Sequence, residues 1–65
     1  MESKLKEREG TKVVVIFHHN DSIAEVVGIL EETPVSWHVY RKGVQVYFYS
    51  GDVTNLVDDT IHIGE

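Results

Sequence analysis

The chain has 65 residues, no cysteine and a formal net charge of −5, so it holds one small domain without a disulfide or a thiolate metal site. A domain of this size buries only about 60% of the surface that its unfolded chain exposes, so we expect oligomerisation to add stability. Residues 13–65 contain two basic side chains, Arg41 and Lys42, against eight acidic ones. This balance argues against a generic DNA-binding protein, because Lys and Arg make the phosphate contacts.

Residues 1–11 are predicted to form a short helix or a flexible arm. Leu5 is the one apolar side chain between Met1 and Val13, and Gly10 is a suitable residue to end a helix. Residues 12–18 (KVVVIFH) follow as the surest strand, because β-branched and aromatic residues fill most of it.

Residues 22–32 (SIAEVVGILEE) fit two structures. As a helix, the segment would begin with a capping box of Ser22 and Glu25, and its apolar residues recur at helical spacing. As a strand, Gly28 would mark a bend or a bulge. The local signals favour the helix.

The next segments predict strands. Residues 35–40 (VSWHVY) and 44–50 (VQVYFYS) alternate around a turn at residues 41–43, which predicts a β-hairpin. Residues 53–57 form a short strand or one helical turn. Residues 59–65 are a tail, within which residues 60–63 could add a short edge strand.

Two architectures follow from these segments. With a helix at 22–32 the chain is an α+β domain of order β-α-β-β, and its closing helix would have to fit into about two turns at residues 52–58. With a bent strand at 22–32 every segment has a natural length. We therefore expect a mostly β fold, with a short N-terminal helix and a five-stranded, bent antiparallel sheet that forms a small barrel over residues 12–58.

Gly28 and residues 47–57 (YFYSGDVTNLV) carry a family resemblance. The spacing from Gly28 to Tyr49 and the signature around Tyr49 are similar to those of the Sm-like proteins of the bacterial Hfq type, within the wider class of SH3-like barrels. In Hfq a glycine lets the second strand bend, and a Lys-His pair binds uridine; that pair is Ser50-Gly51 here. The resemblance implies the barrel, strand edges that pair in a hexameric or heptameric ring, and a role for Tyr49.

The hairpin supplies the candidate ligand contacts. Its tyrosines would share one face with His38, as a platform for stacking bases or, alternatively, as a subunit interface or solvent face. Two basic residues at its tip could contact phosphates. The candidate nucleic-acid-binding residues are Tyr49, Tyr47, His38, Arg41 and Lys42.

The edges of an open barrel are unpaired and can join subunits. The predicted interface residues are Val44, Val46, Phe48, Val53 and Leu56. His18 and His19 would point to opposite faces of a strand, and the other histidines are scattered, so we expect no metal site. No nucleophile with a base, paired carboxylates or phosphate loop is recognisable, so we expect neither an enzyme nor a cofactor.

The sequence indicates a cytoplasmic protein without membrane contact. Its longest apolar run, residues 13–17, is far shorter than the ~20 residues that span a bilayer, and residues 1–10 lack the apolar segment of a signal peptide. The resemblance implies a non-enzymatic, ring-forming homo-oligomer that binds RNA in post-transcriptional regulation. Two alternatives remain open: an acidic protein-protein interaction module with an SH3-like barrel, and a β-α-β-β regulatory domain that binds a small molecule.

Overall fold

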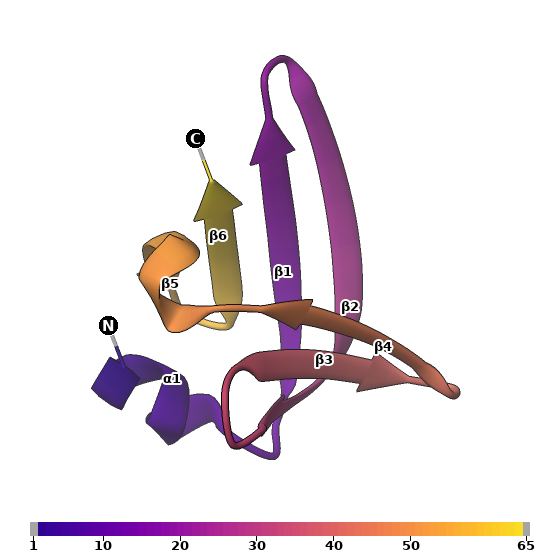
Figure 1. Ribbon diagram of the computed structural model, residues 1–65, viewed down its shortest axis with the longest axis vertical. Coiled ribbons are helices and arrows are strands. Elements are labelled where there is room, and N and C mark those ends of the chain that lie inside the picture. The colour runs from indigo at the N-terminus through magenta and orange to yellow at the C-terminus, as the bar shows by residue number, and fades with distance from the viewer. Residues whose placement is uncertain (1, 65) are drawn as a thin grey trace.

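The computed structural model describes residues 2–64, which contain one short α-helix, six strands and one turn of 3-10 helix (Figure 1). In chain order these are α1 (Glu2–Arg8), β1 (Lys12–His19), β2 (Ser22–Glu32), β3 (Trp37–Arg41), β4 (Val44–Phe48), η1 (Ser50–Asp52), β5 (Val53–Val57) and β6 (Thr60–Gly64). The predicted mostly β fold with an N-terminal helix is confirmed. Of the two structures predicted for residues 53–57, the strand is correct.

All six strands form one sheet of order β4-β3-β2-β1-β6-β5. Every neighbouring pair is antiparallel except β1 and β6, which run parallel. The expected sheet of five antiparallel strands therefore differs from the structure by one strand and one parallel pair.

Residues 60–63 were predicted as a possible short edge strand within a tail; they are a strand, but it lies inside the sheet and not at its edge. A two-residue turn at Asp58-Asp59, with Asp58 at a φ of 55°, returns the chain so that β6 lies between β1 and β5. Ile61 and Ile63 are 0% and 8% exposed, because alternate residues of β6 point into the core. Residues 60–64 thus form an interior strand, and β5 takes the edge position.

β2 changes its partner part-way along its length. Residues 22–29 pair with β1, whereas residues 29–32 pair with β3, so Ile29 lies at a corner of the sheet. Figure 1 shows β3 and β4 running across the direction of β1 and β2. The β-α-β-β alternative is wrong, because pairing on both sides of the segment outweighs its helical pattern.

Gly28 makes this corner possible. A Cβ built at Gly28 would lie 2.6 Å from the carbonyl oxygen of Tyr40 and 2.7 Å from Cγ1 of Val39. Neither contact is tolerable for a carbon atom, and one of them is with the backbone of β3. Glycine is required here for the close approach of β3.

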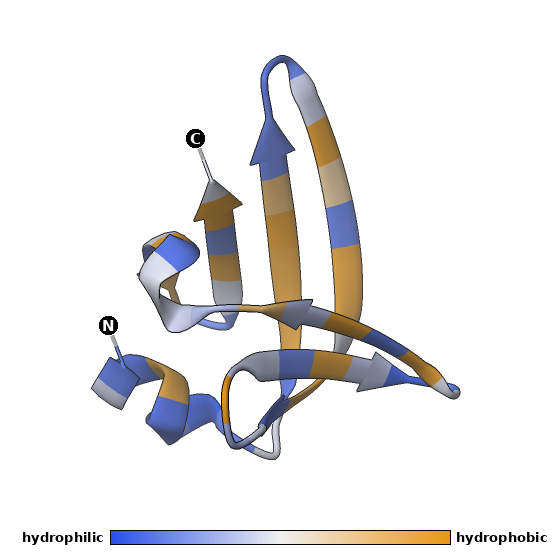
Figure 2. Cartoon of the chain, in the orientation of Figure 1, coloured by the Kyte–Doolittle hydropathy of each residue, from blue (hydrophilic) through white to orange (hydrophobic). Residues whose placement is uncertain are grey.

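The core lies on the inner side of the bent sheet. Figure 2 shows the apolar positions that supply it, as a continuous stretch along β1 and in alternation with polar positions along β6. The buried residues are Leu5, Val13, Val15, Leu30, Trp37, Val39, Phe48, Leu56, Ile61 and Ile63. Trp37 is in this set, as its alternation in β3 predicts.

α1 is packed against this core through Leu5, which is 0% exposed. The indole Nε1 of Trp37 donates to Oε1 of Glu2 at 2.7 Å, and the Lys6 ammonium pairs with Glu32. The hydrogen bond and the charge of Glu32 raise the pKa of Lys6. Of the two structures predicted for this segment, the helix is correct. No helix within residues 2–64 is long and apolar enough to cross a membrane.

Substituting Gly28 tests the corner. We expect Gly28→Ala to lower the free energy of unfolding by about 1–3 kcal/mol or more, because the new methyl group forces β3 away from β2. The control is Gly51→Ala, where a Cβ would meet nothing within 4 Å and which we expect to change stability by less than about 0.5 kcal/mol. Urea denaturation followed by tryptophan fluorescence measures both. Equal effects at the two glycines would contradict this role for Gly28.

Candidate binding face on strands β2 to β4

The register of β2, β3 and β4 places two rows of side chains on the outer side of the sheet. One row runs Glu31, His38, Tyr47 and the other runs Ile29, Tyr40, Gln45. Because side chains alternate along each strand, the residues between them point inward to the core. The six residues of these rows are called the outer face below.

His38 lies at the centre of its row and is held by both neighbours. Its Nε2 lies 2.7 Å from Oε1 of Glu31, and its ring centroid lies 5.3 Å from that of Tyr47 at an interplanar angle of 58°. Only 13% of its side chain is exposed. When Nε2–H donates to Glu31, Nδ1 is an acceptor, and this buried atom has no hydrogen-bond partner among residues 2–64.

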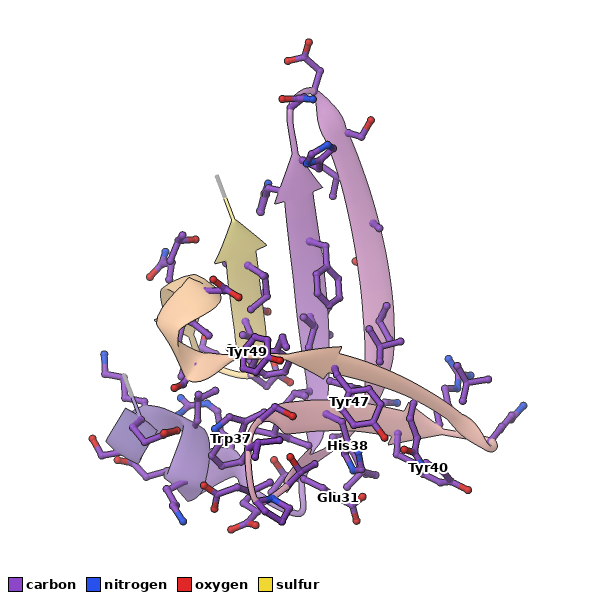
Figure 3. The ribbon with its side chains drawn as sticks, viewed as in Figure 1. Glu31, Trp37, His38, Tyr40, Tyr47 and Tyr49 are labelled. Carbon is purple, nitrogen blue, oxygen red and sulfur yellow. The ribbon has the colours of Figure 1, made fainter. Side chains whose placement is uncertain are left out.

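The tyrosines are the most accessible rings of this region. Tyr47 is 55% exposed, Tyr49 62% and Tyr40 40%, and the hydroxyl of Tyr47 donates to Oε1 of Gln45. In Figure 3, Tyr40, Tyr47 and His38 lie along the β3-β4 hairpin, whereas Tyr49 lies toward η1. Exposed rings held on paired strands are able to stack on planar ligands, because little side-chain freedom remains to be lost.

Basic side chains gather at the tip of the hairpin. Arg41 and Lys42 line two adjoining grooves, of about 340 and 300 Å³, between the tip and β2. Lys12 lines the second groove together with Ile29 and Tyr40. Half of the six basic residues of the chain therefore meet beside the outer face.

The turn that carries these charges has an unusual backbone. Lys42 and Gly43 have φ values of 51° and 83°, and two positive φ angles are the condition for a type I′ hairpin turn. Asn or Gly usually occupies the first position, and a lysine there costs backbone energy. The turn aims the Lys42 side chain at the groove, and a smaller residue would form this turn more readily.

Four of the five candidate nucleic-acid-binding residues lie on one hairpin, and their role in binding stays a prediction. The structure brings Tyr47, His38, Arg41 and Lys42 together on the β3-β4 hairpin. Tyr49 follows β4 in extended backbone, outside the two rows. Glu31 and Lys12 were missed, although strand alternation would have placed Glu31 beside His38 once β2 was known to be a strand.

The predicted interface residues fall into two groups. Phe48 and Leu56 are 4% and 6% exposed, so their side chains point inward and belong to the core, and pairing of their strands with a neighbouring subunit stays a prediction. Val46 and Val53 are half-buried, and Val44 is 62% exposed. Alternation had identified the apolar side of each strand without showing that this side faces the subunit's own core.

The strands themselves are nevertheless the edges of the sheet. β4 and β5 each have one strand neighbour, and each is five residues long. A register shift between Val53 and Asn55 places a bulge at Thr54, so the regular part of the β5 edge is residues 55–57. Unpaired edges of this kind can accept a strand from another chain.

No protein-family model, curated protein or solved structure matches the chain. The candidate site therefore rests on the geometry described above.

A pair of truncations tests the core position of Phe48 on β4. We expect Phe48→Ala to lower the free energy of unfolding by about 3–5 kcal/mol, because it opens a cavity in the core. Val44→Ala, on the same strand, should change it by less than about 0.5 kcal/mol. Thermal unfolding followed by circular dichroism compares the two. A small effect of Phe48→Ala on stability, together with loss of self-association, would contradict the core position and show that this side chain packs against a neighbouring subunit.

Proposed function

We propose that this protein is a non-enzymatic, ring-forming binding module of the Sm-like type, in the cytoplasm, and that it binds single-stranded RNA. The observation that carries the proposal is the outer face, where Tyr40 and Tyr47 are 40% and 55% exposed and Tyr40 shares a groove with the basic hairpin tip. Bases can stack on the rings while the cations contact phosphates, which is the general mode of single-strand binding.

Charge supports a ring as the binding form. One chain of net charge −5 offers only three basic residues beside the outer face, and phosphate contacts grow in number with the copies present. A closed ring repeats the hairpin tip around its axis. It also pairs the β4 edge of one subunit with the β5 edge of the next, which removes the exposed edges of both.

The acidic character of the rest of the chain favours a protein partner as the second candidate. Glu31 lies on the outer face itself and pairs with His38, so part of this surface carries negative charge. An RNA would contact the Tyr40 and hairpin-tip side of the face, whereas a basic peptide would contact the Glu31 side. Binding measurements that separate these two sides decide between the candidates.

The ring is tested by native mass spectrometry. We expect a hexamer or heptamer of the full chain, since strand pairing between β4 and β5 closes the assembly. Val57→Lys should reduce the assembly without unfolding the subunit, because Val57 is 53% exposed on the β5 edge and a lysine there disfavours edge pairing. A stable monomer of the unsubstituted protein at micromolar concentration would contradict the ring.

RNA binding is tested by fluorescence anisotropy with U-rich and A-rich oligonucleotides at low salt. We expect Tyr40→Ala to weaken binding by about 1–3 kcal/mol and Tyr40→Phe to weaken it little, because stacking uses the ring rather than the hydroxyl. Lys42→Asn should remove about one phosphate contact per chain, and so lower the slope of the logarithm of the affinity against the logarithm of the salt concentration, while keeping the turn. The matched control is Lys4→Gln, an exposed lysine of α1.

Binding of neither oligonucleotide at low salt would remove RNA from the proposal. If Lys4→Gln and Lys42→Asn have equal effects, the charge acts without a specific site. If a basic peptide binds and Glu31→Gln abolishes that binding, the second candidate replaces the first.

A further inference from the structure

Two histidines that lie 44 positions apart in the sequence meet on neighbouring strands. Nε2 of His18, on β1, lies 3.0 Å from Nδ1 of His62, on β6. Their ring centroids are 5.2 Å apart and the planes differ by 22°, so the rings approach each other through their nitrogen atoms. β1 and β6 are the parallel pair, and they lie side by side in Figure 1.

The strand register explains how the rings can meet. His18 is level with Gly64 on β6, so no side chain stands beside it there. A Cβ at Gly64 would lie 2.5 Å from the carbonyl oxygen of His18, and Gly64 has a φ of +81°. Glycine therefore lets β6 approach β1 closely at this level, and the ring of His62, two residues earlier on the same face of β6, reaches His18.

The two facing nitrogens have two chemical uses. In the metal-free protein one imidazole donates its N–H to the lone pair of the other, and this needs different tautomers in the two rings. If the donor ring moves its proton to its other nitrogen, both facing atoms become lone-pair donors. Small rotations of the rings then aim both lone pairs at one point beside the contact.

The spacing suits one metal ion. Two nitrogens at about 2.0–2.1 Å from a metal are about 2.9–3.4 Å apart for bond angles between 90° and tetrahedral. The 3.0 Å between His18 and His62 lies within this range. Neutral imidazole is a preferred ligand of Zn²⁺, Ni²⁺ and Cu²⁺.

We propose that His18 and His62 form a two-imidazole chelate for a divalent transition-metal ion such as Zn²⁺. Within residues 2–64 no third histidine, cysteine or carboxylate completes a cluster with them, so water fills the remaining coordination positions. The ion joins β1 and β6, which are neighbours in the sheet but the first and last strands in chain order. In a small chain without cysteine, it would act as the staple that such domains commonly need.

This site was not predicted from the sequence, where His18 and His19 point to opposite faces of a strand and the other histidines are scattered. His19 is exposed and lies next to His18 on the same strand, so it points to the opposite face. It provides a matched control that removes an imidazole one position away from the chelate. His38 is a second control, since its ring is held by Glu31.

The experiment titrates the full chain with ZnCl₂ at neutral pH in a buffer that does not bind metal, by isothermal calorimetry. We expect one ion per chain. His18→Gln and His62→Gln should each weaken binding by about tenfold or more, and the double variant should lose no more than either single one, because a chelate needs both rings. His19→Gln and His38→Gln should leave the affinity within twofold.

Nitrogen-15 spectra of the imidazole rings provide a measurement on the unsubstituted protein. On addition of Zn²⁺, Nε2 of His18 and Nδ1 of His62 should shift together, and the melting temperature should rise with metal concentration. Equal losses in all four variants, or shifts confined to His19 or His38, would overturn the chelate. Absence of binding at millimolar Zn²⁺ would overturn it as well. None of these outcomes depends on whether the protein binds RNA.

Discussion

The contact between Gly28 and the backbone of β3 is the constraint on which the rest of this structure depends. Because residue 28 has no side chain, the carbonyl of Tyr40 can approach it closely. At the next residue, Ile29, the pairing of β2 with β1 ends and its pairing with β3 begins. This corner turns a flat antiparallel arrangement into a bent sheet whose inner side encloses one core.

Both candidate surfaces follow from the bend. On the outer side it presents the rows of Glu31, His38, Tyr47 and of Ile29, Tyr40, Gln45 beside the basic hairpin tip. It also leaves β4 and β5 as the two edges of the sheet. On the side of β1 away from β2, β6 pairs in parallel with β1 and brings His62 to His18.

Much of the frame can be read from the sequence, and the reasons are local. β-branched runs and alternation identify β1, β3 and β4, and a glycine inside an apolar segment indicates the position of the corner. The helical pattern of residues 22–32 is equally local but predicts the wrong structure. Periodicity within a segment carries no information on its pairing with two other strands. The lengths of the surrounding segments, together with the resemblance from Gly28 to Tyr49, favoured the correct structure.

The remaining features are non-local, and the sequence does not carry them. Alternation assigns Phe48 and Leu56 to an apolar side but cannot tell whether that side faces the subunit's own core or a neighbour. A five-residue strand after Asp58-Asp59 can lie at the edge of the sheet or between two other strands. Only its parallel pairing with β1 decides between these positions. The same register brings His18 to His62 and the corner brings Lys12 to the hairpin tip, so neither neighbour was predictable from spacing.

The bent strand is tested most directly by nuclear Overhauser contacts between backbone protons of the isotope-labelled protein. We expect Ile29 to show cross-strand contacts both to Lys12 on β1 and to Tyr40 on β3, and residues 22–32 to show the sequential pattern of an extended strand. Contacts from Ile29 to only one of these strands, or helical contacts between residues three apart within 22–32, would contradict the bent strand.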